Sequence, residues 1–411
     1  MTISRRSFVR GAAALPFAVR ALARTGPSPR IVVVGAGAFG GWTAFHLRRL
    51  GAKVTLVDSW GPGNARSSSG GETRVIRAIY GADREYTEMV RRAYAMWETL
   101  DASTDETLYV ETGALWLHRG DDAYVRSSVP VMQATGFPID QMTVTDAARR
   151  YPQIEFKGVK SVWLERRAGA LSARRACAVV RDAFQKAGGS YRTAHVEIPE
   201  LDKQPSTLRL ADGSTLDADA FVFACGPWLG QVFPDLLGEA IQPTRQEVYY
   251  FGAPRGSERY QPGRLPIWID FGERIFYGVP DLGGSGFKIA DDTRGEPFDP
   301  TNGNRTPSDE GLARARAVLA ERFPELSNAP LLKAEVCQYE NSPDGNLIID
   351  RHPRAANVWL IGGGSGHGFK LSPAVGEMAA NRILSGKEVP KMFLLERLRD
   401  TKKRGTQFDR N

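Results

Sequence analysis

Residues 31–58 read IVVVGAGAFGGWTAFHLRRLGAKVTLVD, and this stretch decides the fold class of the chain. A run of four aliphatic residues predicts a buried strand, a glycine turn and a helical segment follow, and a second apolar strand ends at Asp58. This order is that of a βαβ unit. The glycine spacing matches a dinucleotide fingerprint, in which Gly35 allows the sharp turn, Gly37 lets the backbone approach a pyrophosphate, and Gly40 brings the helix close to the sheet.

Asp58 supports this interpretation because it follows Gly40 by 18 residues and ends the second strand. At that position a carboxylate can bind the ribose hydroxyls of an adenine nucleotide, and it would repel a 2′-phosphate. The N-terminus of the intervening helix would face the pyrophosphate. Residues 31–58 therefore predict a Rossmann-like adenine dinucleotide site, but they do not distinguish FAD from NAD. A glycine-rich turn in some other α/β protein is the alternative.

The pattern of the remaining chain predicts an α/β (α+β) protein whose nucleotide domain is discontinuous. Amphipathic helices are expected at 85–100, 172–188 and 307–322, whereas 241–336 holds short apolar runs divided by proline and glycine, as in an antiparallel sheet. An α/β pattern returns from 358 onward. We therefore expect a Rossmann-like domain formed by residues 28–84, 165–240 and 337–397, a β-rich substrate domain formed by 85–164 and 241–336, and a C-terminal tail at 398–411.

The composition and charge of the chain favour small-molecule chemistry. Its 411 residues, 42% of them hydrophobic, can bury a large core and are enough for two domains. The net charge is +7, but the charges are interspersed and form no stripe of the kind that nucleic-acid binding needs. Outside the N-terminus, no apolar stretch reaches the roughly 20 residues of a membrane-spanning helix. Cys177, Cys225 and Cys337 have no spacing typical of zinc or of a disulfide framework, and no metal site is expected.

The N-terminus resembles a twin-arginine export signal over residues 1–23. Ser4-Arg5-Arg6-Ser7-Phe8 precedes a short apolar run, and Ala21-Leu22-Ala23 is typical of a cleavage site. Removal of this leader would take away four arginines and no acidic residue, so the net charge would fall from +7 to +3. We therefore expect the twin-arginine export machinery as a partner and a periplasmic or secreted location. The apolar run is shorter than the roughly 20 residues that span a bilayer, so membrane anchoring is less favoured. A chance basic start is the other alternative.

Seven motifs together make the chain similar to a known family. Besides GAGAFG, they are GGETRVIRAIYG at 70–81, TGALWL at 112–117, ACGPW at 224–228, FYGVPDLGGSGFK at 276–288, CQYENSPDGNLIID at 337–350, and GGGSGHGFKLSPAVGE at 362–377. In this order and at these spacings, they resemble the monomeric sarcosine oxidase branch of the D-amino-acid-oxidase-like flavoproteins, which also contains N-methyltryptophan and pipecolate oxidases. The resemblance covers nearly the whole chain after the leader. It implies an FAD-binding Rossmann-like domain, a small amino-acid-like amine and O2 as partners, and a monomer.

The resemblance implies that FAD is attached covalently. In the family a cysteine forms a thioether with the 8-methyl group of the isoalloxazine, and the cysteine of CQY matches it at Cys337. The loop Gly366-His367-Gly368 would contact the flavin through its backbone amides, and Arg74 matches a position near the flavin ring. A buried structural cysteine is the alternative for Cys337, and Cys177 and Cys225 are interpreted as core residues.

Family positions also imply how the substrate is held. Arg77 and Lys370 match the arginine and lysine that bind the substrate carboxylate, and a guanidinium can grip a carboxylate with two hydrogen bonds while a lysine adds a second positive charge. Tyr277 and Tyr339 match aromatic positions of the pocket, although either tyrosine could be core packing. Lys288 matches the lysine that activates oxygen, where a fixed cation stabilises the negative charge that develops on O2.

Three departures from the family leave the substrate open. Gly70 stands where sarcosine-specific members have a histidine ahead of the TR pair, and Asp292 stands where they have a histidine four residues after the oxygen lysine. Asp292 could favour a cationic amine or point away from the site. Trp268 replaces a slimmer apolar residue, and we expect it to reshape the roof of the substrate pocket.

These observations predict an FAD-dependent oxidation of a secondary or N-methyl amino acid to an imine, with O2 reduced to H2O2. The nearest alternative is a dehydrogenase that passes electrons to a quinone or another carrier. A flavin-loaded binding or accessory protein without turnover is a second alternative. A NAD-linked reductase is less favoured, because the chain has no second nucleotide fingerprint.

Overall fold

The computed structural model describes residues 27–198, 204–399 and 405–409, and two large sheets organise them. The first sheet has six strands and contains the predicted βαβ unit, since β1 pairs in parallel with both β2 and β12. Strands β9 and β19 extend it in parallel, and β18 adds an antiparallel edge. In spatial order its strands are β18 (Ile348–Arg351), β19 (Val358–Gly362), β12 (Ala220–Phe223), β1 (Arg30–Val34), β2 (Lys53–Asp58) and β9 (Ser190–Thr193).

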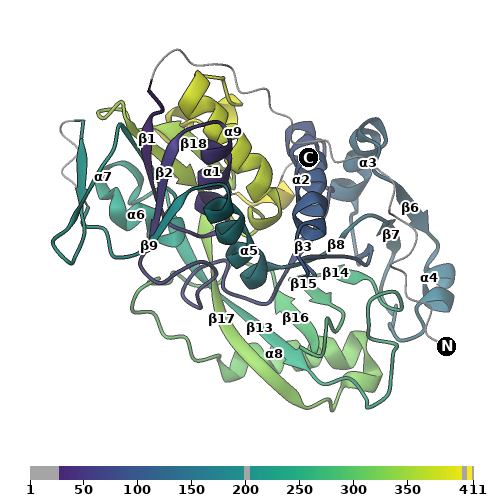
Figure 1. Cartoon of the computed structure of the whole chain (residues 1–411). Coiled ribbons are helices and arrows are strands. Elements are labelled where there is room, and N and C mark those ends of the chain that lie inside the picture. The colour runs from purple at the N-terminus through teal and green to yellow at the C-terminus, as the bar shows by residue number, and fades with distance from the viewer. Residues whose placement is uncertain (1–26, 199–203, 400–404, 410–411) are drawn as a thin grey trace.

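Helices cover one face of this sheet, where α1 (Ala38–Arg49) lies between α5 (Ala173–Lys186) and α9 (Ser372–Ser385) (Figure 1). The backbones of α1 and α9 approach so closely that a Cβ atom at Gly376 would lie 2.6 Å from the carbonyl carbon of Trp42. Along β1, Ile31 and Val33 belong to the core on this face, whereas Val32 belongs to the core on the opposite face. Burial on both faces explains why the strand is aliphatic throughout.

The second sheet has eight strands and joins two distant parts of the chain. Antiparallel pairs run from β17 through β13, β16 and β15 to β14, which confirms the antiparallel pattern predicted for 241–336. Strand β14 then pairs in parallel with β5, a contact that the sequence did not predict. The order is β17 (Leu331–Asn341), β13 (Gln242–Phe251), β16 (Phe287–Asp291), β15 (Ile275–Val279), β14 (Ile267–Phe271), β5 (Ala114–His118), β7 (Ser161–Glu165) and β6 (Ile139–Met142).

Smaller elements complete the chain. A three-stranded sheet carries the TR motif in its first strand. Each of its strands lies at a point of the sequence where the chain passes from one large sheet to the other. The remaining elements are β3 (Thr73–Ile76), β8 (Gly169–Ser172), β4 (Tyr109–Glu111), β10 (Thr207–Arg209), β11 (Thr215–Asp217), α2 (Arg84–Ala102), α3 (Ala123–Thr135), α4 (Val144–Arg150), α6 (Leu229–Val232), α7 (Pro234–Leu237), α8 (Asp309–Arg322) and short 3₁₀ turns, which include η4 (Phe369–Leu371) and η7 (Gln407–Asp409). The helices expected at 85–100, 172–188 and 307–322 correspond to α2, α5 and α8.

The two large sheets follow the predicted domain segments in part. Every strand of the six-stranded sheet lies within the segments predicted for the Rossmann-like domain. The long strand β17, however, crosses the boundary expected after residue 336 and carries Cys337 and Tyr339 near its end. Helix α2, expected in the substrate domain, packs against α9, and Trp97 Nε1 donates a hydrogen bond of 2.9 Å to the Lys370 carbonyl. The two units are therefore joined where the predicted site residues lie.

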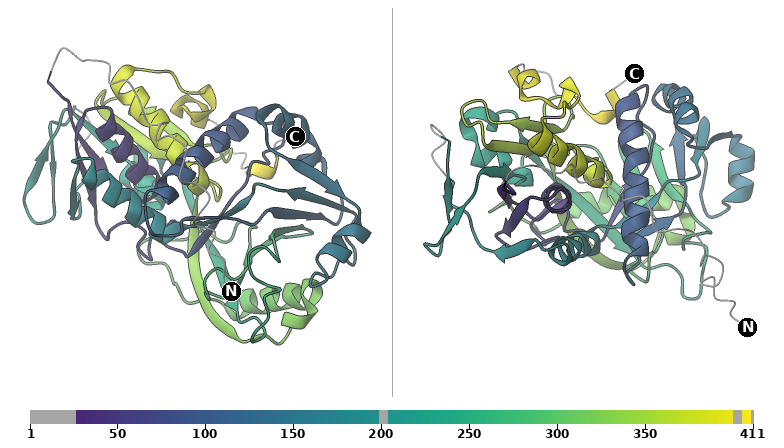
Figure 2. Two further views of the ribbon diagram at one scale, coloured as in Figure 1. Left: turned by 45° about the vertical axis from the view of Figure 1, so that its right-hand side comes forward. Right: turned by 45° about the horizontal axis from the view of Figure 1, so that its top comes forward.

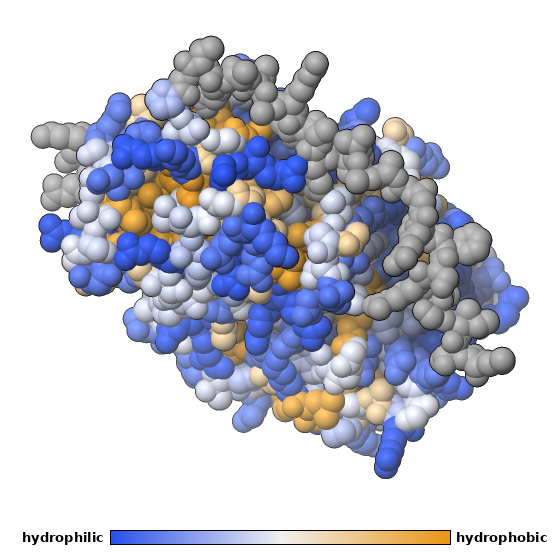
Figure 3. Space-filling view, viewed as in Figure 1, coloured by the Kyte–Doolittle hydropathy of each residue, from blue (hydrophilic) through white to orange (hydrophobic). Residues whose placement is uncertain are grey.

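On the face drawn in Figure 3, hydrophobic side chains form separate patches among hydrophilic ones. Among the described residues, no helix is both long and apolar enough to cross a membrane. The predicted export leader at 1–23 lies outside the described residues.

Candidate active site

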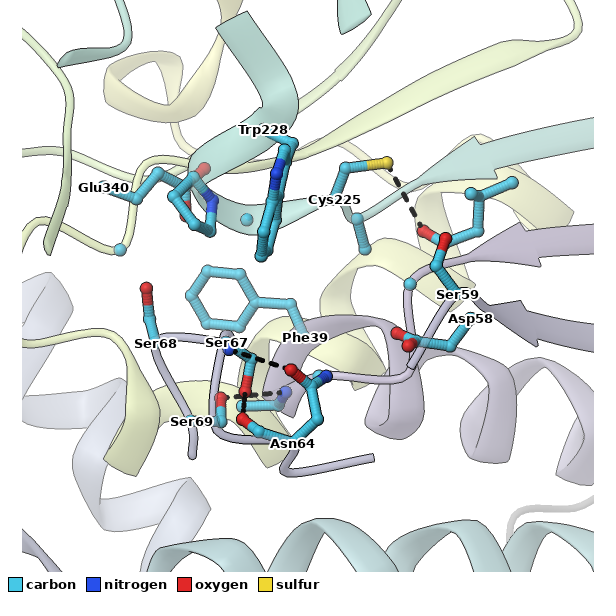
Figure 4. A pocket seen from close by; sticks show the side chains of 18 of the residues that line it. Phe39, Asp58, Ser59, Asn64, Ser67, Ser68, Ser69, Cys225, Trp228 and Glu340 are labelled. Carbon is cyan, nitrogen blue, oxygen red and sulfur yellow. Dashed lines mark hydrogen bonds between the residues drawn. The ribbon is translucent and has the colours of Figure 1, made fainter. Parts of the chain in front are cut away.

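A cavity of about 390 Å³ opens where the carboxyl ends of β1, β2 and β12 meet. Figure 4 shows Phe39 and Trp228 facing one another inside it, with Asp58 to one side and Glu340 to the other. A crevice at the carboxyl ends of parallel strands is the usual ligand site of such a sheet.

The three fingerprint glycines have different local roles. Gly35 has a φ of +102°, and a Cβ atom there would lie 2.4 Å from the carbonyl oxygen of Ala224. A Cβ atom at Gly40 would lie 1.8 Å from the Gly35 oxygen, so the helix can start this close to the turn only with glycine. Gly37 lines the cavity, and its Cβ position meets no atom nearer than Ser69 Oγ at 3.9 Å. Packing within the protein therefore explains Gly35 and Gly40 but leaves open space at Gly37, as a bound ligand would need.

Two carboxyl groups stand at opposite sides of this cavity. Asp58 Oδ2 accepts a hydrogen bond of 2.7 Å from the Ala36 amide, and its Oδ1 accepts from the amides of Trp60 and Gly61 at 2.8 and 2.7 Å. Glu340 Oε1 accepts from the Gly363 amide at 2.9 Å, and burial raises the pKa of Glu340 to about 7. A carboxyl group that titrates near neutrality can donate a hydrogen bond to an anionic ligand. The sequence prediction did not include Glu340, which has no distinguishing motif besides its place after CQY.

A second, smaller cavity of about 70 Å³ adjoins the first. The residues that line both cavities are Arg74, Tyr339, Gly366 and Phe369. The second cavity also brings together predicted residues from the TR motif, β15, β17 and the GHGFK loop, namely Arg77, Tyr277, Cys337, His367 and Lys370. Gly368 lines the first cavity. The structure thus gathers nearly all of the predicted site residues around two adjoining cavities.

Cys337 has a cationic neighbour at the junction of the cavities. The Nη2 group of Arg74 donates to Cys337 Sγ at 3.3 Å and to the Ser68 carbonyl at 2.5 Å, while Nη1 donates to the Thr73 carbonyl at 2.7 Å. Positive charge beside a cysteine is typical of reactive rather than structural cysteines. Burial raises the pKa of Cys177 to about 12, in accordance with its interpretation as a core residue.

Arg77 and Lys370 form a pair of buried cations on the second cavity. Arg77 is 5% and Lys370 3% exposed. Arg77 Nη1 donates to the Ile79 carbonyl, Lys370 Nζ donates to the His367 carbonyl at 2.8 Å, and both cations lie over the Tyr80 ring, at 4.8 and 5.2 Å from its centroid. Within the described part of the chain neither cation forms a salt bridge. Burial, followed by the charge of Arg77, holds the pKa of Lys370 well below its usual range. The negative charge of a bound anion would counteract both effects by favouring the protonated amine.

Two buried carboxyl groups accompany this cationic pair. Tyr339 Oη donates to Asp292 Oδ1 at 2.5 Å, and burial raises the pKa of Asp292 to about 6. Glu165 Oε1 accepts from the Ala78 amide at 2.5 Å, and burial raises its pKa to about 7. Asp292 lines the cavity, which answers the question that the sequence left open about its direction. Glu165 was missed, because it is an ordinary residue at the end of an apolar strand.

Comparison with known proteins agrees with this geometry. The family described as FAD dependent oxidoreductase (DAO) matches residues 30–382. The chain belongs to this family. A monomeric sarcosine oxidase of Bacillus sp. (strain B-0618) is 30% identical over 365 residues, which cover 87% of this chain and 92% of the relative. An N-methyl-L-tryptophan oxidase of Salmonella enteritidis PT4 is 28% identical over 364 residues, covering 86% and 94%. The predicted resemblance is confirmed.

Solved structures confirm the fold of this FAD-dependent oxidoreductase. An L-proline dehydrogenase from P. horikoshii has a TM-score of 0.78 at 22% identity, and the match covers 92% of this chain and 99% of that one. A fructosyl amine: oxygen oxidoreductase (Amadoriase I) from Aspergillus fumigatus has a TM-score of 0.73 at 22% identity, covering 92% and 93%. The predicted α/β fold with a Rossmann-like domain is therefore confirmed.

The residues present fit FAD, the cofactor of the family. The open space at Gly37 and the carboxylate of Asp58 suit a pyrophosphate and a ribose. Ser68 Oγ is buried in the wall of the first cavity and has no hydrogen-bond partner among the described residues, so a ligand can supply one. A flavin ring placed where the cavities join would lie next to Cys337.

The structure places Lys288 outside both cavities. It is 1% exposed, its Nζ donates to the Thr73 carbonyl at 3.1 Å, and it lies 5.2 Å from the centroid of the Tyr277 ring. Burial, followed by the charge of Arg74, lowers the pKa of Lys288 to about 7. Lys288 therefore lies behind Tyr277 and Arg74, both of which line the second cavity.

The prediction for Trp268 is wrong. Its side chain is fully buried in the core beneath α8, stacked on Phe287 at a centroid distance of 6.3 Å and tilted against Phe323 at 5.1 Å. The next residue, Ile269, lines the second cavity instead. Successive side chains of a strand point to opposite faces, so a shift by one position moves a residue from pocket to core.

The structure also places three residues in the cavity walls that were not among the predicted site residues. Cys225, interpreted as a core residue, contributes to the wall of the first cavity, with Sγ 3.8 Å from the Val34 carbonyl (Figure 4). Gln407 and Phe408, which belong to the segment predicted as a C-terminal tail, line the second cavity. A single aromatic residue near a polar terminus gave no sequence signal for this placement.

Proposed function

We propose that this FAD-dependent oxidoreductase oxidises a secondary or N-methyl amino acid to an imine and reduces O2 to H2O2. The observation that carries the proposal is the buried pair of Arg77 and Lys370 on a cavity that adjoins the dinucleotide cavity. The names of its relatives, sarcosine oxidase and N-methyl-L-tryptophan oxidase, support an N-methyl amino acid as the substrate class.

The cationic pair selects a carboxylate. Each buried charge costs free energy unless an opposite charge compensates it. In the part of the chain described, the carboxyl groups of Glu165 and Asp292 lie near the pair, but neither forms a salt bridge with Arg77 or Lys370. A substrate carboxylate between Arg77 and Lys370 supplies that charge, and the planar guanidinium can bind it with two hydrogen bonds. This contact fixes the substrate at one end, so the amine is held in one place within the cavity.

Asp292 is the acceptor that we assign to the ammonium proton of the substrate. Amine oxidation needs the neutral amine, whereas a free amino acid carries an ammonium group at neutral pH. Asp292, with a pKa of about 6, is largely ionised at pH 7, and its Oδ1 is held by Tyr339 Oη at 2.5 Å. A carboxylate fixed in this manner can accept and hold the proton.

The cofactor supplies the redox chemistry when it is bound: it accepts two electrons from the carbon next to the amine and passes them to an acceptor. We propose that the 8-methyl group of the flavin is linked to Cys337 Sγ, beside Arg74. Lys288 would place a positive charge behind the cavity wall and favour O2 as the acceptor. The alternative acceptor, a quinone or another carrier, is favoured by one observation: Lys288 lines neither of the two cavities.

A single screen tests the substrate class. Purified enzyme is mixed without oxygen with N-methyl, cyclic and D-amino acids and, for comparison, with amines that lack a carboxylate, such as N-methylethylamine, and loss of flavin absorbance is recorded. Only amines with a carboxylate should bleach the flavin. Failure of every such amine would overturn the proposal and favour a binding protein without turnover.

The acceptor needs a separate measurement. Rapid mixing of the reduced enzyme with air-saturated buffer gives the rate of reoxidation. Reoxidation faster than turnover supports the oxidase, whereas a slower rate that a soluble quinone accelerates would assign a dehydrogenase.

We also propose export of the folded protein through the twin-arginine machinery, on the basis of residues 1–23. Fractionation of cells that express the chain should find it in the periplasm or medium. Replacement of Arg5 and Arg6 by lysine should retain it in the cytoplasm, and unchanged export would contradict the proposal.

A further inference from the structure

The C-terminal residues return to the second cavity. In the left view of Figure 2, the yellow turn before the C mark lies over the strands of the second sheet. Two hydrogen bonds attach the segment that leads into it: Arg294 Nη2 donates to the Gly405 carbonyl at 2.6 Å, and the Gly405 amide donates to the Pro343 carbonyl at 2.7 Å. The turn itself, η7 (Gln407–Asp409), therefore has a defined position against the cavity.

Phe408 covers the carboxylate-binding arginine. Its ring meets Tyr124 of α3 and Phe271 of β14 edge-on, each at a centroid distance of 5.3 Å. The Arg77 guanidinium lies 5.6 Å from the centroid of the Phe408 ring and 5.3 Å from that of Trp116. Phe408 is half-buried, whereas Arg77 is 5% exposed, so the phenylalanine forms the outer side of the aromatic enclosure around this cation.

Gln407 presents an unused hydrogen-bond acceptor. Its side chain is 5% exposed and lines the second cavity, and its Oε1 has no hydrogen-bond partner among the described residues. Buried amide oxygens are nearly always paired, because an unpaired one loses its hydrogen bonds to water without replacement. An N–H group of a bound molecule would satisfy it.

We propose that residues 405–409 form a specificity-determining wall of the substrate site. Phe408 shields the contact between Arg77 and the substrate carboxylate from water, and Gln407 Oε1 accepts a hydrogen bond from an N–H group of the same molecule. The inference rests on the proposed function, because it takes an amino acid as the ligand. It adds that the ligand has, besides its carboxylate, an N–H group that is free to donate to Gln407 while Arg77 holds the carboxylate.

Two carboxylates of nearly equal shape test the role of Gln407. Pyrrole-2-carboxylate has a ring N–H group, whereas furan-2-carboxylate has a ring oxygen in its place. Their dissociation constants are measured on the FAD-loaded full chain from changes in the flavin spectrum, a readout that requires no turnover. The wild type should bind the pyrrole about tenfold more tightly than the furan, and Gln407→Leu should reduce this ratio to about one. An unchanged ratio in Gln407→Leu would overturn the assignment.

Phe408 is tested with the same two ligands. Phe408→Ala should weaken both about equally, by roughly tenfold, because the Arg77 contact becomes exposed to water, while Phe408→Leu should retain most of the affinity. Leu332→Ala is the matched control, since Leu332 is 55% exposed and lines neither cavity. Equal affinities of the wild type and Phe408→Ala for the two ligands would overturn the proposal that Phe408 shields the Arg77 contact.

Binding to the wild type distinguishes a failure of the proposed cationic clamp from a failure of the C-terminal wall. If neither carboxylate binds the wild type, the cationic clamp of the proposed function is wrong, and the present inference is overturned with it. If the two carboxylates bind the wild type, and if their affinities are the same in Gln407→Leu and Phe408→Ala, the clamp stands and the C-terminal wall alone is refuted. Unfolding temperatures of the variants, compared with that of the wild type, identify any loss that comes from misfolding.

Discussion

Replacement of Arg77 by methionine removes the charge that the clamp depends on while it keeps much of the side-chain volume. Truncation of one partner of a buried charge pair costs about 2–5 kcal/mol. Lys370 Nζ remains on the same cavity, and its pKa should rise once the neighbouring charge of Arg77 is gone. The lower half of the range is therefore expected, about 2–3 kcal/mol, which corresponds to about 30- to 150-fold weaker binding.

The assay separates binding from chemistry. The dissociation constant is taken from flavin spectra with a carboxylate ligand, and the limiting rate of anaerobic flavin reduction is taken at saturating substrate. Arg77→Met should raise the dissociation constant by the stated factor. Arg91→Met serves as the control, because Arg91 is a surface residue paired with Glu88 at 2.8 Å. A change of less than threefold in Arg77→Met would refute the clamp.

The other predictions concern the flavin link, the oxygen side and the amine side. Cys337→Ala should release yellow flavin when the protein is precipitated with acid, whereas wild-type pellets should stay yellow, and colourless wild-type pellets would contradict the covalent link. Lys288→Met should slow reoxidation by O2 and spare flavin reduction; because the pKa of Lys288 is lowered to about 7, wild-type reoxidation should slow as pH rises through 7 and the lysine loses its charge. Asp292→Asn should lower the rate of flavin reduction about 10²-fold or more; in the wild type this rate should rise with pH through about 6, as Asp292 ionises, and a flat profile would refute its role.

The sequence predicted those parts of the fold and the site that local patterns determine. The βαβ unit was predictable because a strand, a glycine turn, a helix and an acidic terminus follow one another within 31–58. Gly35 and Gly40 stand out because only glycine fits the close contacts that this turn imposes. The joint pattern of motifs singled out Cys337 and Lys370, and both line the second cavity. An isolated cysteine or lysine would not have indicated such a position.

The parts that were missed depend on contacts between distant segments. The parallel pair of β14 and β5 joins residues more than a hundred positions apart, and no local pattern specifies it. Trp268 was misplaced because the face to which a strand side chain points depends on the register of that strand in the sheet, and no local sequence pattern specifies this register. Glu340 and Gln407 matter through burial alone: each is an ordinary polar residue until the fold removes it from water.

We propose that a carboxylate-bearing amine is oxidised at the junction of the two cavities. It is tested most directly by anaerobic flavin reduction with a matched pair of amines, N-methylalanine and N-methylethylamine, which differ by the carboxylate. N-methylalanine should bleach the flavin of the wild type, N-methylethylamine should do so at least about 10²-fold more slowly at equal concentration, and Arg77→Met should largely remove this difference. Equal rates for the two amines in the wild type would contradict it.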